Sequence, residues 1–174
     1  MIPAPPQPSH EESADHSWMI QTQEKALDRI SEWIRAADSK TSPILAIDTA
    51  MIAAIVALAA RPGAWSQWSG LWIILGSAFP LTSLLMIAFA TSPQLEGHQP
   101  SLIFFGDVAS LSASEYDARV ATRTQRDYLV DLNSQCHRNS EIASRRYRWI
   151  RHATLALLFG MVPWLLSLFL VVQG

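Results

Sequence analysis

Two long runs of uncharged residues restrict what this chain can become. Residues 71–90 and 153–172 contain no Asp, Glu, Lys or Arg and consist mainly of apolar side chains. A helix rises about 1.5 Å per residue, so about 20 apolar residues cross the roughly 30 Å hydrocarbon core of a bilayer. Each run therefore predicts a membrane-spanning helix. A third apolar run, 44–60, is shorter and contains Asp48, so a buried helix of a soluble fold competes with a third span.

The distribution of the 13 Lys and Arg residues favours three spans. Cytoplasmic flanks of membrane helices are rich in these residues. Before the run 44–60 lie Lys25, Arg29, Arg35 and Lys40. Between the runs 44–60 and 71–90 lies Arg61. Between the runs 71–90 and 153–172 lie Arg119, Arg123, Arg126, Arg138, Arg145, Arg146, Arg148 and Arg151. Three spans place all of them except Arg61 on one side, whereas two spans remove this contrast. The pattern predicts a multi-pass inner-membrane protein with a cytoplasmic N-terminus and a periplasmic C-terminus.

The predicted fold class is all-α: an integral membrane protein with three transmembrane helices and a small cytoplasmic helical bundle. In chain order we expect a disordered tail (1–17), a cytoplasmic amphipathic helix (18–42), a first span (43–60), a periplasmic loop (61–70), a second span (71–90), a cytoplasmic helical region (91–152) and a third span (153–172). The proline-rich start lacks an apolar run, which indicates the tail. Ser42 and Pro43 suit the N-cap and first position of a helix, so a helix boundary is expected there.

The cytoplasmic region contains a helix start and an expected break. Ser112 and Glu115 have the S-x-x-E spacing of a capping box. The chain then contains neither Gly nor Pro up to residue 159, and we expect a break within 132–140, where Asn, Ser and His are weak helix formers. The pieces would form a bundle with the amphipathic helix. The apolar stripe of that helix, which is also a candidate surface for homo-oligomerisation, consists of Ile20, Leu27, Ile30, Ile34 and Ala37.

Several classes of function have no support in the sequence. The single cysteine, Cys136, excludes an intrachain disulfide and a multi-cysteine metal site. A net charge of −2 gives no indication of a nucleic-acid polymer as partner. His137 and Glu141 share a helix face, but two residues do not make a metal site. No nucleophile–base pair, metal cluster or phosphate loop is recognisable, so we expect a protein that is not an enzyme and has no cofactor.

Three stretches together resemble a known family. They are "AADSKTSPILAID", "SLIFFGDVASLSASEY" and "IASRRYRWIRHA", and "FFGDVASLS" is the most specific part. From about Ile34 to the end of the third span, the chain resembles the transmembrane effectors of Pycsar, the pyrimidine-cyclase anti-phage systems. The resemblance implies that a partner cyclase makes cyclic UMP (cUMP) or cyclic CMP (cCMP) during infection. The effector then senses this nucleotide in its cytoplasmic region and disrupts the inner membrane, which causes abortive infection.

The resemblance assigns no ligand contacts, so the candidate site is argued from chemistry. A cyclic nucleotide presents an anionic phosphodiester, which suits arginines and free backbone N–H groups, and a planar base, which suits aromatic or hydrogen-bonding side chains. Such groups gather around the helix start at Ser112. The candidate ligand residues are Phe105, Asp107, Tyr116, Arg119, Arg123 and Arg126. The alternative is that the three arginines are solvated or paired with Glu115, Asp127 and Asp131.

The run from Leu102 to Phe105 is expected to dock this loop against the bundle, with Gly106 permitting the turn into the next helix. That docking is either purely structural or the element that the ligand switches.

A second group of candidates belongs to the membrane. Asp48 lies about one turn inside the first span, where a carboxylate is costly, so it either pairs helices or lines a water-filled path, or else snorkels to the interface. Pro80 and Pro163 lie near the middles of their spans and are candidate gating kinks or merely structural prolines. The residues expected to anchor to lipid headgroups are Arg145, Arg146, Arg148 and Arg151; phosphate binding is the alternative. A rival to the effector hypothesis is a membrane-anchored module that recruits a soluble partner.

Overall fold

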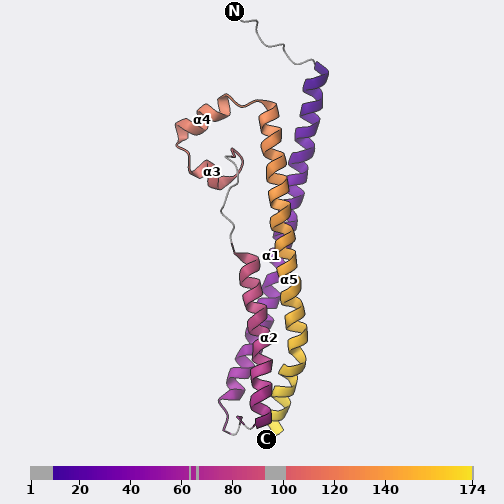
Figure 1. The fold of residues 1–174 in the computed structure, drawn as a ribbon, viewed down its shortest axis with the longest axis vertical. Helices are drawn as coiled ribbons and strands as arrows, with labels where there is room; N and C mark the ends of the chain where they lie inside the picture. The colour runs from indigo at the N-terminus through magenta and orange to yellow at the C-terminus, as the bar shows by residue number, and fades with distance from the viewer. Residues whose placement is uncertain (1–9, 63, 66, 93–100, 174) are drawn as a thin grey trace, which may run out of the picture. The chain divides into compact units, whose positions relative to one another are not determined.

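The computed structural model describes residues 10–62, 64, 65, 67–92 and 101–173. In this part of the chain there are five helices and no strand (Figure 1). They are α1 (His10–Ala59), α2 (Gln67–Thr91), α3 (Phe105–Ala109), α4 (Ala113–Ala121) and α5 (Gln125–Gln173). Apolar segments within α1, α2 and α5 are long enough to cross a membrane. The predicted all-α class with three helices of membrane-spanning character is confirmed.

The chain divides into two compact units. One unit, here called the polar unit, contains the described residues of 1–33 and 94–142. The other, here called the span unit, contains those of 34–93 and 143–174. Helices α1 and α5 contribute residues to both units.

Buried positions in the span unit recur at alternating steps of three and four residues. On α1 they are Ala37, Thr41, Ile44, Asp48, Met51, Ile55 and Leu58. The matching positions include Ile73, Ser83, Ile87 and Ala90 on α2, and Ile150, Ala153, Leu157 and Ser167 on α5. Such spacing produces a single seam along each helix, so α1, α2 and α5 share one interior. Their opposite faces expose large apolar residues such as Val56, Leu85 and Phe159, as expected of helices surrounded by lipid.

Small residues let α2 and α5 approach closely. An added Cβ atom at Gly160 would lie 2.5 Å from the Cβ atom of Phe79, and one at Gly76 would lie 3.1 Å from the Cα atom of Trp164. Small residues at such crossings allow the backbone contact that holds membrane helices together. The Trp164 Nε1–H group also donates a 3.1 Å hydrogen bond to the carbonyl oxygen of Met51. Packing and hydrogen bonding therefore both join α5 to its neighbours.

The expected boundary at Ser42 and Pro43 is wrong, because α1 runs through both residues without interruption. A proline inside a helix removes one backbone hydrogen bond and strains the preceding turn. Here Ala37, Ile44 and Met51 belong to one buried cluster on either side of the proline, and this packing keeps the helix in register. At the other end, α1 begins at His10, so residues 10–17 of the expected tail are helical. Residues 1–9 of that tail lie outside the described residues.

In the polar unit, α1 and the first part of α5 lie side by side. The Tyr128 hydroxyl donates a 2.8 Å hydrogen bond to Glu24 Oε1, and the Cys136 thiol donates to the carbonyl oxygen of Gln23 at 3.5 Å. Leu132 is almost completely buried. The amphipathic residues Leu27 and Ile30 are half-buried, so their stripe is already partly covered within one chain.

The predicted capping box is confirmed. The Ser112 Oγ atom accepts a hydrogen bond from the Glu115 N–H group, and Glu115 Oε2 accepts one from the Ser112 N–H group at 2.9 Å. These bonds satisfy backbone donors at the start of α4 that have no partner inside the helix.

The expected break within 132–140 is wrong, because that segment lies inside α5. The helix is interrupted instead at residues 122–124, and α5 starts from a second capping arrangement. The Thr124 N–H group donates to Asp127 Oδ2 at 3.1 Å, and the Asp127 N–H group donates to Thr124 Oγ1 at 3.2 Å. Burial of Leu132 and Cys136 outweighs the weak helix propensity of their neighbours, since tertiary packing overrides propensity.

Candidate functional site

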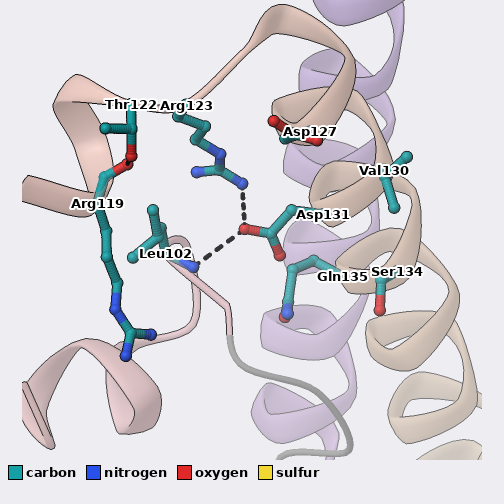
Figure 2. A pocket seen from close by; sticks show the side chains of 9 residues that line it. All are labelled: Leu102, Arg119, Thr122, Arg123, Asp127, Val130, Asp131, Ser134 and Gln135. Atoms are coloured by element: carbon teal, nitrogen blue, oxygen red, sulfur yellow. Dashed lines mark hydrogen bonds and ion pairs between the residues drawn. The ribbon is translucent and has the colours of Figure 1, made fainter.

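The carboxylate of Asp131, on α5, is the centre of the polar unit's hydrogen bonding. Asp131 Oδ1 accepts a 2.7 Å hydrogen bond from the Ser101 hydroxyl, and Oδ2 accepts a 3.0 Å bond from the Leu102 N–H group. The guanidinium group of Arg123 donates to the same Oδ2 atom and forms an ion pair with it (Figure 2). Three donors from the chain therefore converge on one anion.

Ser101 organises the segment that carries two of these donors, residues 101–107, here called the SLIFFGD segment. The Ser101 N–H group donates to Asp107 Oδ2 at 2.9 Å. The Ser101 Oγ atom accepts hydrogen bonds from the N–H groups of Ile103 and Phe104, both at 3.0 Å. These bonds supply partners for backbone groups that a non-helical segment leaves unpaired. Asp107, a predicted ligand residue, therefore closes this turn.

The aromatic residues of the same segment are held differently from each other. The guanidinium carbon of Arg138 lies 5.5 Å from the ring centroid of Phe104, so the segment is docked on α5 by a cation–π contact as well as by Asp131. Phe105 is 67 % exposed. An added Cβ atom at Gly106 would lie 2.6 Å from the Phe104 ring. A side chain at this position would require the Phe104 ring to shift, so the observed ring position depends on Gly106.

A cavity of about 400 Å³ opens beside the Asp131 carboxylate. Its lining comes from the SLIFFGD segment, from the end of α4 with the connection that follows, and from one face of α5 (Figure 2). The lining residues are Leu102, Arg119, Thr122, Arg123, Asp127, Val130, Asp131, Ser134 and Gln135. This volume falls within the range of about 300–1,000 Å³ that is common for small-molecule sites. We call it the Asp131 cavity.

The structure brings some predicted ligand residues to this cavity and leaves others outside its lining. Arg119 and Arg123 line the cavity, whereas the lining omits Phe105, Asp107, Tyr116 and Arg126. The alternative of an ion pair with Asp131 describes Arg123 correctly. The sequence reasoning considered Asp127 and Asp131 only as charge partners, and it missed Thr122, Val130, Ser134 and Gln135 as lining residues. For Asp127, Asp131 and Gln135 the available signal was their four-residue spacing, which places them on one helix face.

The charges in the cavity are held in fixed places. The side chains of Arg123 and Asp131 are only 15 % and 12 % exposed, and the guanidinium carbon of Arg123 also lies 5.0 Å from the ring centroid of Tyr128. Burial, followed by the hydrogen bond to Glu24, raises the pKa of Tyr128. The hydrogen bond from the Thr124 side chain lowers the pKa of Asp127, which keeps Asp127 ionised. The lining thus combines two guanidinium groups with two carboxylates.

The predicted membrane candidates lie in the span unit. Asp48 is 0 % exposed, and its Oδ2 atom accepts a 2.6 Å hydrogen bond from the Ser83 hydroxyl on α2. This contact contradicts the snorkelling interpretation and agrees with pairing between helices. Pro80 and Pro163 are both buried inside their helices.

The four arginines expected at lipid headgroups do not share one environment. Arg146 forms an ion pair with Asp38, and the Nζ atom of Lys40 lies 5.2 Å from the ring centroid of the neighbouring Tyr147. Arg145, Arg148 and Arg151 are exposed. Lipid anchoring therefore stays a prediction for these three, while Arg146 already has a partner within the chain.

His137 and Glu141 are exposed, and the His137 Nδ1 atom lies 3.9 Å from Glu141 Oε2. No group of three metal-binding side chains occurs among the described residues.

Comparison with known proteins now identifies the family. A family model described as "Pycsar effector protein domain" matches residues 22–173. The chain belongs to the Pycsar effector family. The Pycsar effector protein PtPycTM of Propioniciclava tarda is 26 % identical to this Pycsar effector over 161 residues, which cover 86 % of this chain and 76 % of the relative. No solved structure matches the chain. The predicted resemblance is confirmed.

Membership fixes the coarse role of the molecule. This Pycsar effector is a membrane protein with three helices long and apolar enough to span a bilayer. The matched range begins within α1 and ends at the last residue of α5. Both the Asp131 cavity and the Asp48–Ser83 contact therefore lie inside the family domain.

Proposed function

We propose that this Pycsar effector acts in anti-phage defence by binding cUMP or cCMP, made by a partner cyclase, in the Asp131 cavity. Binding then leads to disruption of the bacterial inner membrane and to abortive infection. The observation that carries the proposal is the Arg123–Asp131 ion pair, which lies in a ligand-sized cavity of a Pycsar effector. The proposed topology has the polar unit in the cytoplasm, where a partner cyclase would release its product.

The cavity lining suits the chemistry of a cyclic pyrimidine nucleotide. Arg119 and Arg123 provide guanidinium groups for the phosphodiester, which bears one negative charge. Asp127 and Ser134 provide oxygen atoms for the ribose hydroxyl. Gln135 carries both a donor and an acceptor on its amide, so it complements the base edge of either uracil or cytosine. This lining therefore suits cUMP and cCMP alike.

We infer that the nucleotide acts by competing with Asp131 for Arg123. The two side chains are largely shielded from water, so separating them without replacing the lost charge partner is costly. An incoming phosphodiester supplies that replacement charge and makes the exchange favourable. Asp131 would then retain only Ser101 and Leu102 as donors, and the SLIFFGD segment is expected to shift with it.

Helix α5 gives this change a covalent route to the membrane. Asp131 and the apolar run 153–172 belong to the same helix, so a displacement of Asp131 acts directly on a spanning element. Pro80 and Pro163 are proposed as the places where the spans bend, because a proline leaves one helical hydrogen bond unmade. Three spans per chain enclose no pore of their own, so the membrane lesion is proposed to require several copies. Arg145, Arg148 and Arg151 are proposed to hold anionic headgroups, each contributing about 1 kcal/mol.

Direct binding measurements test the proposal. Full-length protein in lipid nanodiscs is titrated with cUMP, cCMP and, as a control nucleotide, cyclic AMP. Arg123→Gln should weaken binding of the active nucleotide about 10- to 100-fold, because a hydrogen bond between charged groups contributes about 1.5–3 kcal/mol. Arg126→Gln is the matched control, since Arg126 is exposed and outside the cavity lining.

Membrane potential in cells provides the second readout. Cells that make the effector should depolarise when the active nucleotide is supplied, and cells that make Arg123→Gln should not. Absence of binding by both pyrimidine nucleotides would refute the proposal. Binding without depolarisation, together with stoichiometric capture of one soluble protein, would instead support the membrane-anchored interaction module.

A further inference from the structure

Asp48 is an isolated ionisable residue in the membrane-spanning part of the chain. Among residues 43–60, 71–90 and 153–172 it is the only Asp, Glu, Lys, Arg or His. Its side chain points into the interior of the span unit and is 0 % exposed. Oδ2 accepts the hydrogen bond from Ser83, whereas Oδ1 has no hydrogen-bond partner within the described part of the chain.

Helix pairing alone does not account for a carboxyl group at this position. An acidic side chain in a membrane helix costs about 2.5–3.5 kcal/mol at the helix centre, whereas a neutral amide or hydroxyl forms an interhelical hydrogen bond at lower cost. Another fully buried hydroxyl in this interior, that of Ser167, donates to the carbonyl oxygen of Trp164 at 2.7 Å. It therefore leaves Oδ1 unsatisfied, and the carboxyl group keeps one oxygen atom available for another partner.

The polar and apolar faces of the three helices indicate which partner that is. Large apolar residues occupy the outward faces, while Asp48 and Ser83 face the shared interior. If the helices separate enough to admit water, these two side chains are the polar groups that the water meets at this depth. A carboxylate without a basic neighbour attracts cations and repels anions, as acidic rings do in cation channels. Two oxygen atoms are too few to hold a divalent cation firmly, so the contact suits small monovalent cations in passage.

We propose that Asp48 is the cation-contacting and selectivity-determining residue of the membrane lesion, with K⁺ and Na⁺ as the ions that pass it. Ser83 holds the Asp48 carboxyl group between α1 and α2 until the helices separate. This inference rests on the proposed nucleotide-triggered membrane disruption, and it adds that the lesion is selective for small cations.

Ion selectivity in reconstituted membranes tests the inference. Full-length effector is reconstituted into planar bilayers of phosphatidylethanolamine and phosphatidylglycerol under a KCl gradient, and cUMP or cCMP is added. The wild-type current should reverse near the K⁺ equilibrium potential. Asp48→Asn, which keeps the shape of the side chain, should still bind nucleotide and conduct, but its current should reverse near zero because K⁺ preference is lost. Asp48→Glu should retain K⁺ preference.

Two further variants separate charge from packing. Ser83→Ala should keep K⁺ preference, because Asp48 is retained, and should raise the current measured without nucleotide. Thr49→Val is the control, since Thr49 is exposed and its hydroxyl donates to the Leu45 carbonyl oxygen on the same helix. It should behave as wild type.

The outcomes distinguish this inference from the function on which it rests. No nucleotide-evoked current in the wild type would refute the proposed function, and the inference with it. A nucleotide-evoked current that reverses at zero in the wild type, or passes a fluorescent dye, would overturn the inference alone. The same holds if Asp48→Asn binds nucleotide and conducts with unchanged K⁺ preference.

Discussion

Replacing Asp131 by Asn should make the effector bind its nucleotide more tightly, although Asp131 lines the cavity. The substitution removes the negative charge that holds Arg123 but leaves one side-chain oxygen to accept from Ser101 or Leu102. Arg123 then no longer has to be taken from an internal partner when the phosphodiester arrives. A structural role alone predicts the opposite sign, because loss of a cavity residue normally weakens binding.

The size of the effect follows from the geometry of the pair. A hydrogen bond between charged groups contributes about 1.5–3 kcal/mol, and about 1.4 kcal/mol corresponds to a tenfold change in affinity. Arg123 and Asp131 are 15 % and 12 % exposed, so residual solvent screening favours the lower end of this range. We expect Asp131→Asn to lower the dissociation constant about tenfold. The melting temperature should fall at the same time, because the ion pair is lost.

Calorimetric titration of the full-length variants with cUMP and cCMP measures the dissociation constants. A thermal melt of the same samples measures the melting temperatures. Asp117→Asn is the matched control, because Asp117 is exposed, lies on α4 outside the cavity lining and carries the same charge. It should change affinity far less than Asp131→Asn does. A folded Asp131→Asn protein with equal or weaker affinity would refute the competition between the nucleotide and Asp131.

Three other predictions concern packing, pH and thiol chemistry. Gly160→Leu should destabilise the effector by about 1–3 kcal/mol, because its Cβ atom would collide with Phe79; an unchanged melting temperature in detergent would contradict this close approach. Hydrogen bonds from their capping partners lower the pKa values of Glu115 and Asp127. Their stabilising contribution is therefore complete above the ordinary carboxyl range and is lost as pH falls through the lowered values, which acid titration of helicity by circular dichroism will detect. Burial raises the pKa of the Cys136 thiol, so at pH 8 it should react with a maleimide more slowly in the folded protein than after denaturation, and equal rates would contradict its burial.

Much of the fold could be predicted because its signals are local. The uncharged runs 71–90 and 153–172 indicate spans by length and hydropathy alone, and both became parts of long helices. The Ser112 capping box depends on residues only three positions apart, so its prediction succeeded. The Thr124–Asp127 pair carries a similar local signal and was overlooked, which led to the helix break being expected too far along the chain.

The candidate site was predicted only in part, because its contacts join distant residues. Arg119 and Arg123 were recognisable as arginines close to the predicted helix start, although Arg123 lies in the interruption after α4. Their cavity forms only because Ser101 and Leu102 meet Asp131, which follows them by about 30 residues. The four-residue spacing of Asp127, Asp131 and Gln135 indicates a shared helix face, but nothing in the local sequence shows that Asp131 becomes shielded from water.

By itself, the sequence determined that the chain is helical and crosses a membrane, and it indicated the family through three short stretches. Hydropathy and capping act between near neighbours, so they can be read from the order of residues. The tertiary structure alone decided that α1 continues through Pro43, that Asp131 holds Arg123, and that Asp48 faces Ser83 across the helix interface. Each of these depends on which helix faces pack together, and that packing is the sum of many contacts between residues far apart in the chain.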